Sequence, residues 1–209
     1  MLNFGESELL QAGHESQGNM ASTIRTFIAV ELTPEHRRAL SQLTRQLARD
    51  WHQYRWVAPE QMHLTLNFLG DVRDEHIATV CEHVRDVAGQ HTAFDISLAE
   101  LGAFPKLTRP RVLWAGVDQN GSALSKIHYQ VADALDEVCR EQDRRRFHPH
   151  VTLGRIRRHE RWPDGIISML ENAPPLDLPP VEISQLTVFA SHLETTGPVY
   201  TVMDRAELS

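Results

Sequence analysis

The sequence lacks the features that mark several classes of protein. Its 209 residues include only two cysteines, Cys81 and Cys139, too few for a disulfide framework, so we expect reduced thiols in a cytoplasmic protein. No apolar run approaches the length of a membrane span. The N-terminus has neither the basic start nor the apolar stretch of a signal peptide. These absences predict a cytoplasmic chain without a membrane partner.

A phosphate-binding loop and an overall positive charge are also absent. No G-x-x-x-x-G-K-[ST] motif occurs, so nothing indicates ATP chemistry. The formal net charge of −7 argues against non-specific binding of nucleic acid. Six arginines nevertheless lie between residues 144 and 158, and they predict a local positive field. Guanidinium groups suit phosphate oxygens, although most of the six could simply be solvated.

The chain divides into a short leader and one larger domain. Residues 1–22 are rich in glycine, serine and acidic residues and show little periodicity, so we expect a disordered leader. Residues 23–209 are predicted to form a single bilobal domain. Apolar spacing predicts helices over 34–50, 74–88, 124–138 and 165–171, and strands over 24–32, 56–57, 61–68, 94–98, 112–117, 147–154, 181–189 and 199–203. Gly70-Asp71 is expected to end the third strand, and a loop is expected around Pro105 to Pro110. Because several strands follow one another directly, the pattern favours an α+β fold with antiparallel sheets.

The most informative feature is a four-residue motif that occurs twice. Residues 63–66 read His-Leu-Thr-Leu and residues 150–153 read His-Val-Thr-Leu. Side chains alternate along a strand, so the histidine and threonine of each motif share one face, about 7 Å apart, while the aliphatic residues face the core. Two such strands would bring two histidines to one cleft between similar lobes.

This arrangement suits in-line displacement at phosphorus. One neutral imidazole, of His63 or His150, can accept a proton from the attacking oxygen while the other, protonated, donates one to the leaving oxygen. The hydroxyls of Thr65 and Thr152 can hydrogen-bond the non-bridging phosphate oxygens. A single H-x-T would more simply be read as a half-buried piece of strand, and it is the repeat that favours catalysis.

Two further residues near the second motif need comment. Arg155 is the arginine we expect to contact phosphate, but on a straight strand it would point away from His150. We therefore expect a bend or bulge at Gly154. His148 and His150 form an H-x-H pair that zinc could accept, but no third ligand stands nearby in the sequence, so we expect no metal.

Taken together, the motifs resemble those of the two-histidine phosphoesterase superfamily. Within it, the flanking segments at residues 25–29, 56–57, 111–117 and 197–200 are similar to those of the RNA 2′,3′-cyclic phosphodiesterases, also called 2′–5′ RNA ligases. The resemblance spans about residues 24–204. It implies a bilobal α+β fold, with two antiparallel sheets flanked by helices around a pseudo-twofold central cleft, and no cofactor.

The resemblance also implies a reaction, the hydrolysis of RNA 2′,3′-cyclic phosphate ends to 2′-phosphomonoesters. It implies catalytic roles for His63 and His150 and phosphate contacts for Thr65, Thr152 and Arg155. His63 would be the acid that protonates the ribose 3′ oxygen and His150 the base that activates water. The clustering of arginines around His150 points the same way, because a positive field favours a neutral imidazole.

Other functions stay open at this point. The substrate could instead be a small cyclic nucleotide or a cyclic ADP-ribose phosphate, because cleft walls outside the motifs decide this. The cleft could also bind a nucleotide or RNA without turnover, although both motifs are intact. We expect a monomer.

Overall fold

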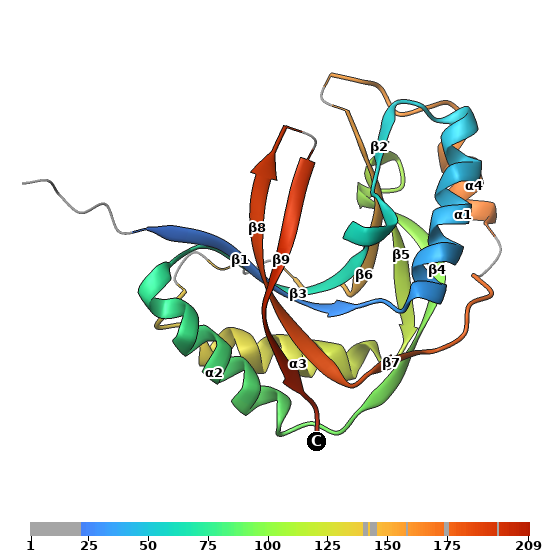
Figure 1. Cartoon of the computed structure of the whole chain (residues 1–209). Helices are drawn as coiled ribbons and strands as arrows, with labels where there is room; N and C mark the ends of the chain where they lie inside the picture. The colour runs from blue at the N-terminus through green and yellow to red at the C-terminus, as the bar shows by residue number, and fades with distance from the viewer. Residues whose placement is uncertain (1–21, 140–141, 143–145, 158, 174–175, 196) are drawn as a thin grey trace, which may run out of the picture.

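The computed structural model describes residues 22–209, except residues 140–141, 143–145, 158, 174–175 and 196 (Figure 1). The predicted disordered leader, residues 1–22, lies outside the described residues apart from Ser22.

The strands pair throughout in the antiparallel sense, which confirms the predicted α+β fold. Within the described part of the chain they form one nine-stranded sheet in the order β7-β4-β5-β6-β3-β1-β8-β9, with β2 paired to β6. The strands are β1 (Thr23–Glu31), β2 (Tyr54–Trp56), β3 (His63–Arg73), β4 (Phe94–Lys106), β5 (Arg109–Gln119), β6 (His150–Ile156), β7 (Val181–Ile183), β8 (Gln185–Glu194) and β9 (Gly197–Glu207).

The two motif strands join the two halves of the molecule. β3 and β6 pair only at Leu64 and Val151, which are the second residues of the two motifs. The prediction of two separate sheets is therefore corrected to one continuous sheet that is nearly divided at this point. Because the pairing joins equivalent residues of a repeated motif, it lies on the pseudo-twofold axis that the repeat predicts.

Helices cover the two halves from different sides. The helices are α1 (Pro34–Asp50), α2 (Ile77–Ala88), α3 (Gly121–Ala134) and α4 (Ile166–Asn172), with 3₁₀ turns η1 (Pro59–Gln61) and η2 (Asp74–His76). Helix α1 begins at a capping threonine, since Thr33 Oγ1 accepts from the His36 backbone N–H at 3.4 Å. In Figure 1, α2 and α3 lie together beneath β3, β8 and β9, whereas α1 and α4 lie beside β2 and β4–β6.

Several predicted element boundaries differ from the structure, among them the following three. β3 continues to Arg73 instead of ending at Gly70, because Gly70 adopts φ = 74° within the strand and still pairs with Thr26. The expected loop around residues 105–110 is the end of a long β4–β5 hairpin in which Pro105 and Pro110 face each other. The helix expected to reach residue 138 ends at Ala134 and is followed by turns.

Candidate active site

Each motif histidine is held by the backbone carbonyl two residues earlier. His63 Nδ1 donates to the Gln61 carbonyl oxygen at 2.7 Å, and His150 Nδ1 donates to the His148 carbonyl oxygen at 2.7 Å. A carbonyl oxygen only accepts, so in each neutral ring the proton is on Nδ1 and Nε2 carries the lone pair. Both histidines are thus oriented to exchange a proton through Nε2, in the same way on both strands.

The repeat extends to an irregularity in each motif strand, of which the sequence indicated only the second. Ile28 and Ala29 of β1 pair with Asn67 and Thr65, so Leu66 is an extra residue in β3. Likewise, Leu113 and Trp114 of β5 pair with Gly154 and Thr152 of β6, so Leu153 is extra there. Each motif therefore contains a β-bulge three residues after its histidine.

In both bulges, the backbone carbonyl oxygen of the extra residue accepts a hydrogen bond from outside the strand ladder. A bulged residue leaves the ladder unpaired, and a buried carbonyl without a donor is costly. The Leu66 oxygen accepts from Nδ1 of the buried His128 at 2.9 Å. The Leu153 oxygen accepts from the backbone N–H of Val57, also at 2.9 Å.

The second bulge brings the Arg155 side chain to the same face of β6 as Thr152. Leu153 and Gly154 are both buried in succession, after which Arg155 is exposed and lines the same cleft as Thr152. The expected bend is therefore present, one residue earlier than predicted. Gly154 has a different role, because a Cβ there would lie 2.9 Å from the Trp56 ring.

A cleft of about 650 Å³ opens beside these residues, a size that suits a nucleotide. It brings together four of the five predicted site residues: His63, Thr65, Thr152 and Arg155. His150 does not line the cleft; it is half-buried and lies on β6 two residues before Thr152, which does line it. The other lining residues are Arg25, Phe27, Arg55, Trp56, Val57, Gln61, Phe68, Ser191, Leu193, Pro198 and Tyr200.

Aromatic rings surround His63. Its imidazole stacks on Phe27 with 4.9 Å between ring centroids and meets the edge of Tyr200 at 5.2 Å. Removal from water disfavours the charged ring and lowers the pKa of His63 to about 4, and the positive charges of Arg37 and Arg155 act in the same direction. In the unliganded protein His63 is therefore neutral at pH 7.

His150 lies among Phe104, Trp114 and His148. Burial also lowers the pKa of His150, with smaller contributions from His148 and Arg155. The argument that clustered arginines single out His150 as the neutral base is therefore not supported. Arg155 acts on both histidines, Arg144, Arg145 and Arg158 lie outside the described residues, and burial is the largest influence on each ring.

The H-x-H pair does not assemble a ligand set. The ring centroids of His148 and His150 are 6.4 Å apart. Among the residues that the structure describes, no third histidine, cysteine or carboxylate joins them in a group able to hold a metal ion.

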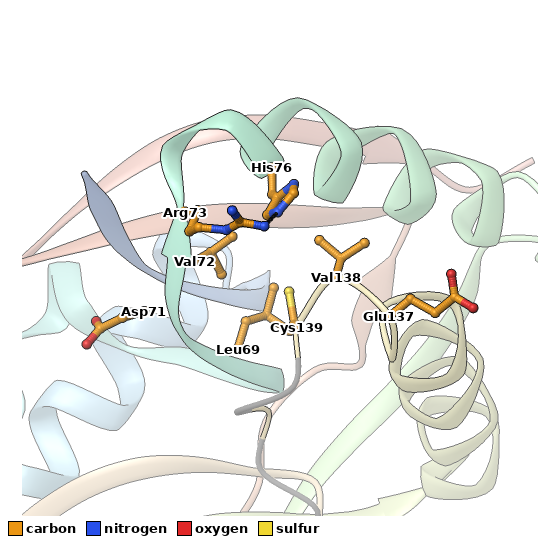
Figure 2. Close-up of a pocket in the computed structure, with 8 residues that line it drawn as sticks. All are labelled: Leu69, Asp71, Val72, Arg73, His76, Glu137, Val138 and Cys139. Atoms are coloured by element: carbon orange, nitrogen blue, oxygen red, sulfur yellow. Dashed lines mark hydrogen bonds between the residues drawn. The ribbon is translucent and has the colours of Figure 1, made fainter. Parts of the chain in front are cut away.

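A second, smaller cavity of about 310 Å³ lies between the end of β3 and the turns after α3. Figure 2 shows Arg73 reaching His76 on one side, with the Cys139 sulfur between Leu69 and Val138. Burial raises the pKa of the Cys139 thiol to about 11, so at pH 7 it is an unreactive thiol. Among the described residues, none that lines this cavity also lines the cleft.

Comparison with known proteins identifies relatives of this chain. A protein from Thermotoga maritima, named an RNA 2′,3′-cyclic phosphodiesterase, is 32% identical over 183 residues, which cover 86% of this chain and 93% of the relative. A protein of the same name from Aquifex aeolicus is 30% identical over 152 residues, or 72% of this chain and 79% of the relative.

Two solved structures have a similar fold. The protein TT0787 from Thermus thermophilus superposes with a TM-score of 0.74 at 27% identity, covering 88% of this chain and 98% of that one. Apo LigT from E. coli gives a TM-score of 0.71 at 25% identity, covering 90% and 99%. No helix in the described residues is long and apolar enough to cross a membrane.

The family model described as LigT-like phosphoesterase matches the chain twice, at residues 30–114 and 116–200. The two matches each contain one motif, as expected for an internal repeat. The resemblance inferred from the motifs is thus confirmed, and the chain belongs to the LigT-like phosphoesterase family.

Proposed function

We propose that this protein hydrolyses RNA 2′,3′-cyclic phosphate ends to 2′-phosphomonoesters by acid–base catalysis with His63 and His150, without a metal. The observation that carries the proposal is the matched pair of Nδ1 hydrogen bonds, which leaves Nε2 of each histidine free to exchange a proton. The names of the relatives from Thermotoga maritima and Aquifex aeolicus support the same substrate.

The proposed reaction begins with the cyclic phosphate between the two motifs. Thr65, Thr152 and Arg155 bind its non-bridging oxygens, whose charge they stabilise as the transition state forms. Nε2 of His150 removes a proton from water, and the water oxygen bonds to phosphorus. The bond from phosphorus to the ribose 3′ oxygen breaks, and protonated Nε2 of His63 donates the proton that this oxygen needs.

The surroundings of the two histidines support this division of roles. The leaving oxygen belongs to the ribose, so the nucleoside lies beside the acid. The cleft and its aromatic walls lie beside His63, whereas His150 does not line the cleft. The pKa of His63, about 4 without ligand, must rise on binding, and the negative charge of the phosphate acts in that direction.

The same chemistry run with an RNA 5′-hydroxyl in place of water would join two ends through a 2′–5′ bond. Ligation is therefore a second reaction that the same residues could perform, by replacing one nucleophile with another.

The decisive experiment measures turnover of several substrates by the purified protein, with and without EDTA. The panel contains an oligoribonucleotide with a 2′,3′-cyclic end, 2′,3′-cyclic AMP, a cyclic ADP-ribose phosphate and an enzyme-free blank. We expect the RNA end to be hydrolysed in EDTA. Preference for the ADP-ribose compound would favour the rival substrate, and binding without turnover would favour a non-catalytic module. Size-exclusion chromatography tests the predicted monomer, and cell fractionation tests the cytoplasmic location.

A further inference from the structure

The two bulges make Phe68 and Arg155 equivalent residues. Each is the fifth residue after its motif histidine, each follows a bulge, and each lines the cleft. The cleft is therefore asymmetric at this point, with a cation on β6 and an aromatic ring on β3. This asymmetry of charge can determine the orientation in which a nucleotide binds.

A neighbouring strand restores a cation on the β3 side. The guanidinium of Arg25, from β1, lies over the Phe68 ring with 4.7 Å between its carbon and the ring centroid. The Arg25 side chain is exposed, lines the cleft and forms no ion pair within the described part of the chain. Asp71 is the cross-strand partner of Arg25 in the register of β1 and β3, but no ion pair joins the two side chains among the described residues. A guanidinium flat on a ring keeps its N–H edge available for an anion or its outer face for a base.

The position of Arg25 lies beyond the reacting phosphate. Phe27 contacts the catalytic His63. Arg25 precedes Phe27 by two residues in β1, so it lies on the same face of the strand, about 7 Å from Phe27. A group bound by Arg25 is therefore the neighbour of the group that reacts. Ser191 of β8 also lines the cleft, and it follows Ala190, the cross-strand partner of Thr26, so the strand beside Arg25 contributes to the same surface.

We propose that Arg25, supported by Phe68, binds the phosphodiester of the nucleotide that precedes the cyclic end, so that the enzyme prefers oligonucleotides to mononucleotides. The inference rests on the proposed function, since it extends the same substrate by one unit. Arg155 contacts the phosphate that reacts, and the Arg25–Phe68 pair contacts the phosphate that does not.

The test compares kcat/KM for a cyclic-ended dinucleotide with kcat/KM for a 2′,3′-cyclic mononucleotide. In Arg25→Gln we expect the ratio of the two values to fall about 10-fold, the usual effect of losing one hydrogen bond to a charged group. With a cyclic-ended oligonucleotide, the slope of log kcat/KM against log salt concentration should become less steep by about 0.7, the value for one phosphate contact on a single strand.

Two further variants complete the experiment. Phe68→Leu removes the ring under Arg25 and should lower the ratio in the same direction. Arg111→Gln is the matched control, because Arg111 also lies over an aromatic ring, Trp162, but outside the cleft. Its ratio should stay at the wild-type value.

The outcomes are separable. An unchanged ratio in Arg25→Gln, whether both activities fall equally or neither falls, would overturn the Arg25 subsite. Absence of turnover of both substrates by the wild-type protein would instead overturn the proposed function.

Discussion

A hydrogen bond joins the side chain of His128, on helix α3, to the backbone of Leu66, the bulged residue of strand β3. Nδ1 of His128, on α3, donates to the Leu66 carbonyl oxygen at 2.9 Å, and the His128 ring stacks on Phe147 with 4.3 Å between centroids. In return, Nδ2 of Asn67 donates to the His128 carbonyl oxygen at 3.1 Å. These contacts hold the bulge that precedes Phe68, the residue of β3 beyond the bulge that lines the cleft.

The first prediction concerns this histidine. His128→Phe keeps a ring that can stack on Phe147 but leaves the buried Leu66 carbonyl without its donor. We expect the free energy of unfolding to fall by about 1–3 kcal/mol, measured by urea denaturation. His52→Phe, on an exposed turn, is the control and should change it little. Equal loss in both variants would mean that the hydrogen bond contributes nothing specific.

Contacts such as the one between His128 and Leu66 could not be predicted from the sequence. Both motifs, and the face shared by each histidine and threonine, could be predicted because strand alternation is a local rule. A bulge near Gly154 could be expected from the position of Arg155, but the bulge in β3 could not. The carbonyl of the bulged residue is satisfied by His128 in one half and by the Val57 backbone in the other, and neither partner is close in sequence.

The electrostatics of the site also depended on tertiary structure. Counting arginines near His150 missed the larger cause of its lowered pKa, because burial comes before the charge of Arg155 for both rings. The aromatic cluster around His63 comes from β1, β8 and β9, and its assembly has no signature within any short stretch of sequence.

The second prediction concerns the two histidines that we propose as catalytic. His63→Ala and His150→Ala should each lower kcat about 10²–10⁴-fold, the usual contribution of a general acid or base. The melting temperature of each variant checks the fold. His148→Ala is the neighbouring control, since His148 holds His150 through its backbone carbonyl and should keep most activity. Near-complete loss in that control would revive the zinc alternative.

The third prediction separates Arg155 from the other arginines of its cluster. Arg155→Gln should weaken binding of inorganic phosphate and lower kcat/KM at least about 10-fold, because a charge-assisted contact to the reacting phosphate is lost. Arg157→Gln is the control, since Arg157 donates to the His52 carbonyl oxygen outside the cleft. Isothermal titration calorimetry and initial rates provide the two measurements. Equal effects would mean that the cluster acts only through its net charge.

The fourth prediction is the titration of His63. Its pKa of about 4 lies below the ordinary 6.5, so between these values the unfolded chain binds the extra proton. The contribution to stability is therefore complete above pH 6.5 and is lost as the pH falls toward 4. Nuclear magnetic resonance of the ring protons should show this low pKa, and saturating phosphate should raise it. A pKa that stays near 4 with phosphate bound would remove His63 as the acid.

The last prediction is the position of the phosphate in the product. In a 2′,3′-cyclic phosphate only the oxygen opposite the attacking water departs, so the oxygen that lies against the acid is the one released. In the proposed reaction the nucleoside binds in the cleft beside His63, and Arg155, which lines the same cleft from β6, binds the charged oxygens. If the substrate binds in this way, the family resemblance assigns the 3′ oxygen to His63.

Digestion of 2′,3′-cyclic AMP should therefore yield 2′-AMP, identified by chromatography beside 2′-AMP and 3′-AMP standards. The orientation depends on Arg155 because its equivalent on β3, Phe68, carries no charge of its own. Arg155→Gln should thus release a larger share of 3′-AMP than the wild-type enzyme, while Arg157→Gln should not. A dominant 3′-AMP product from the wild-type enzyme would mean that the 2′ oxygen lies against the acid, and the ribose would then have to bind in the opposite sense.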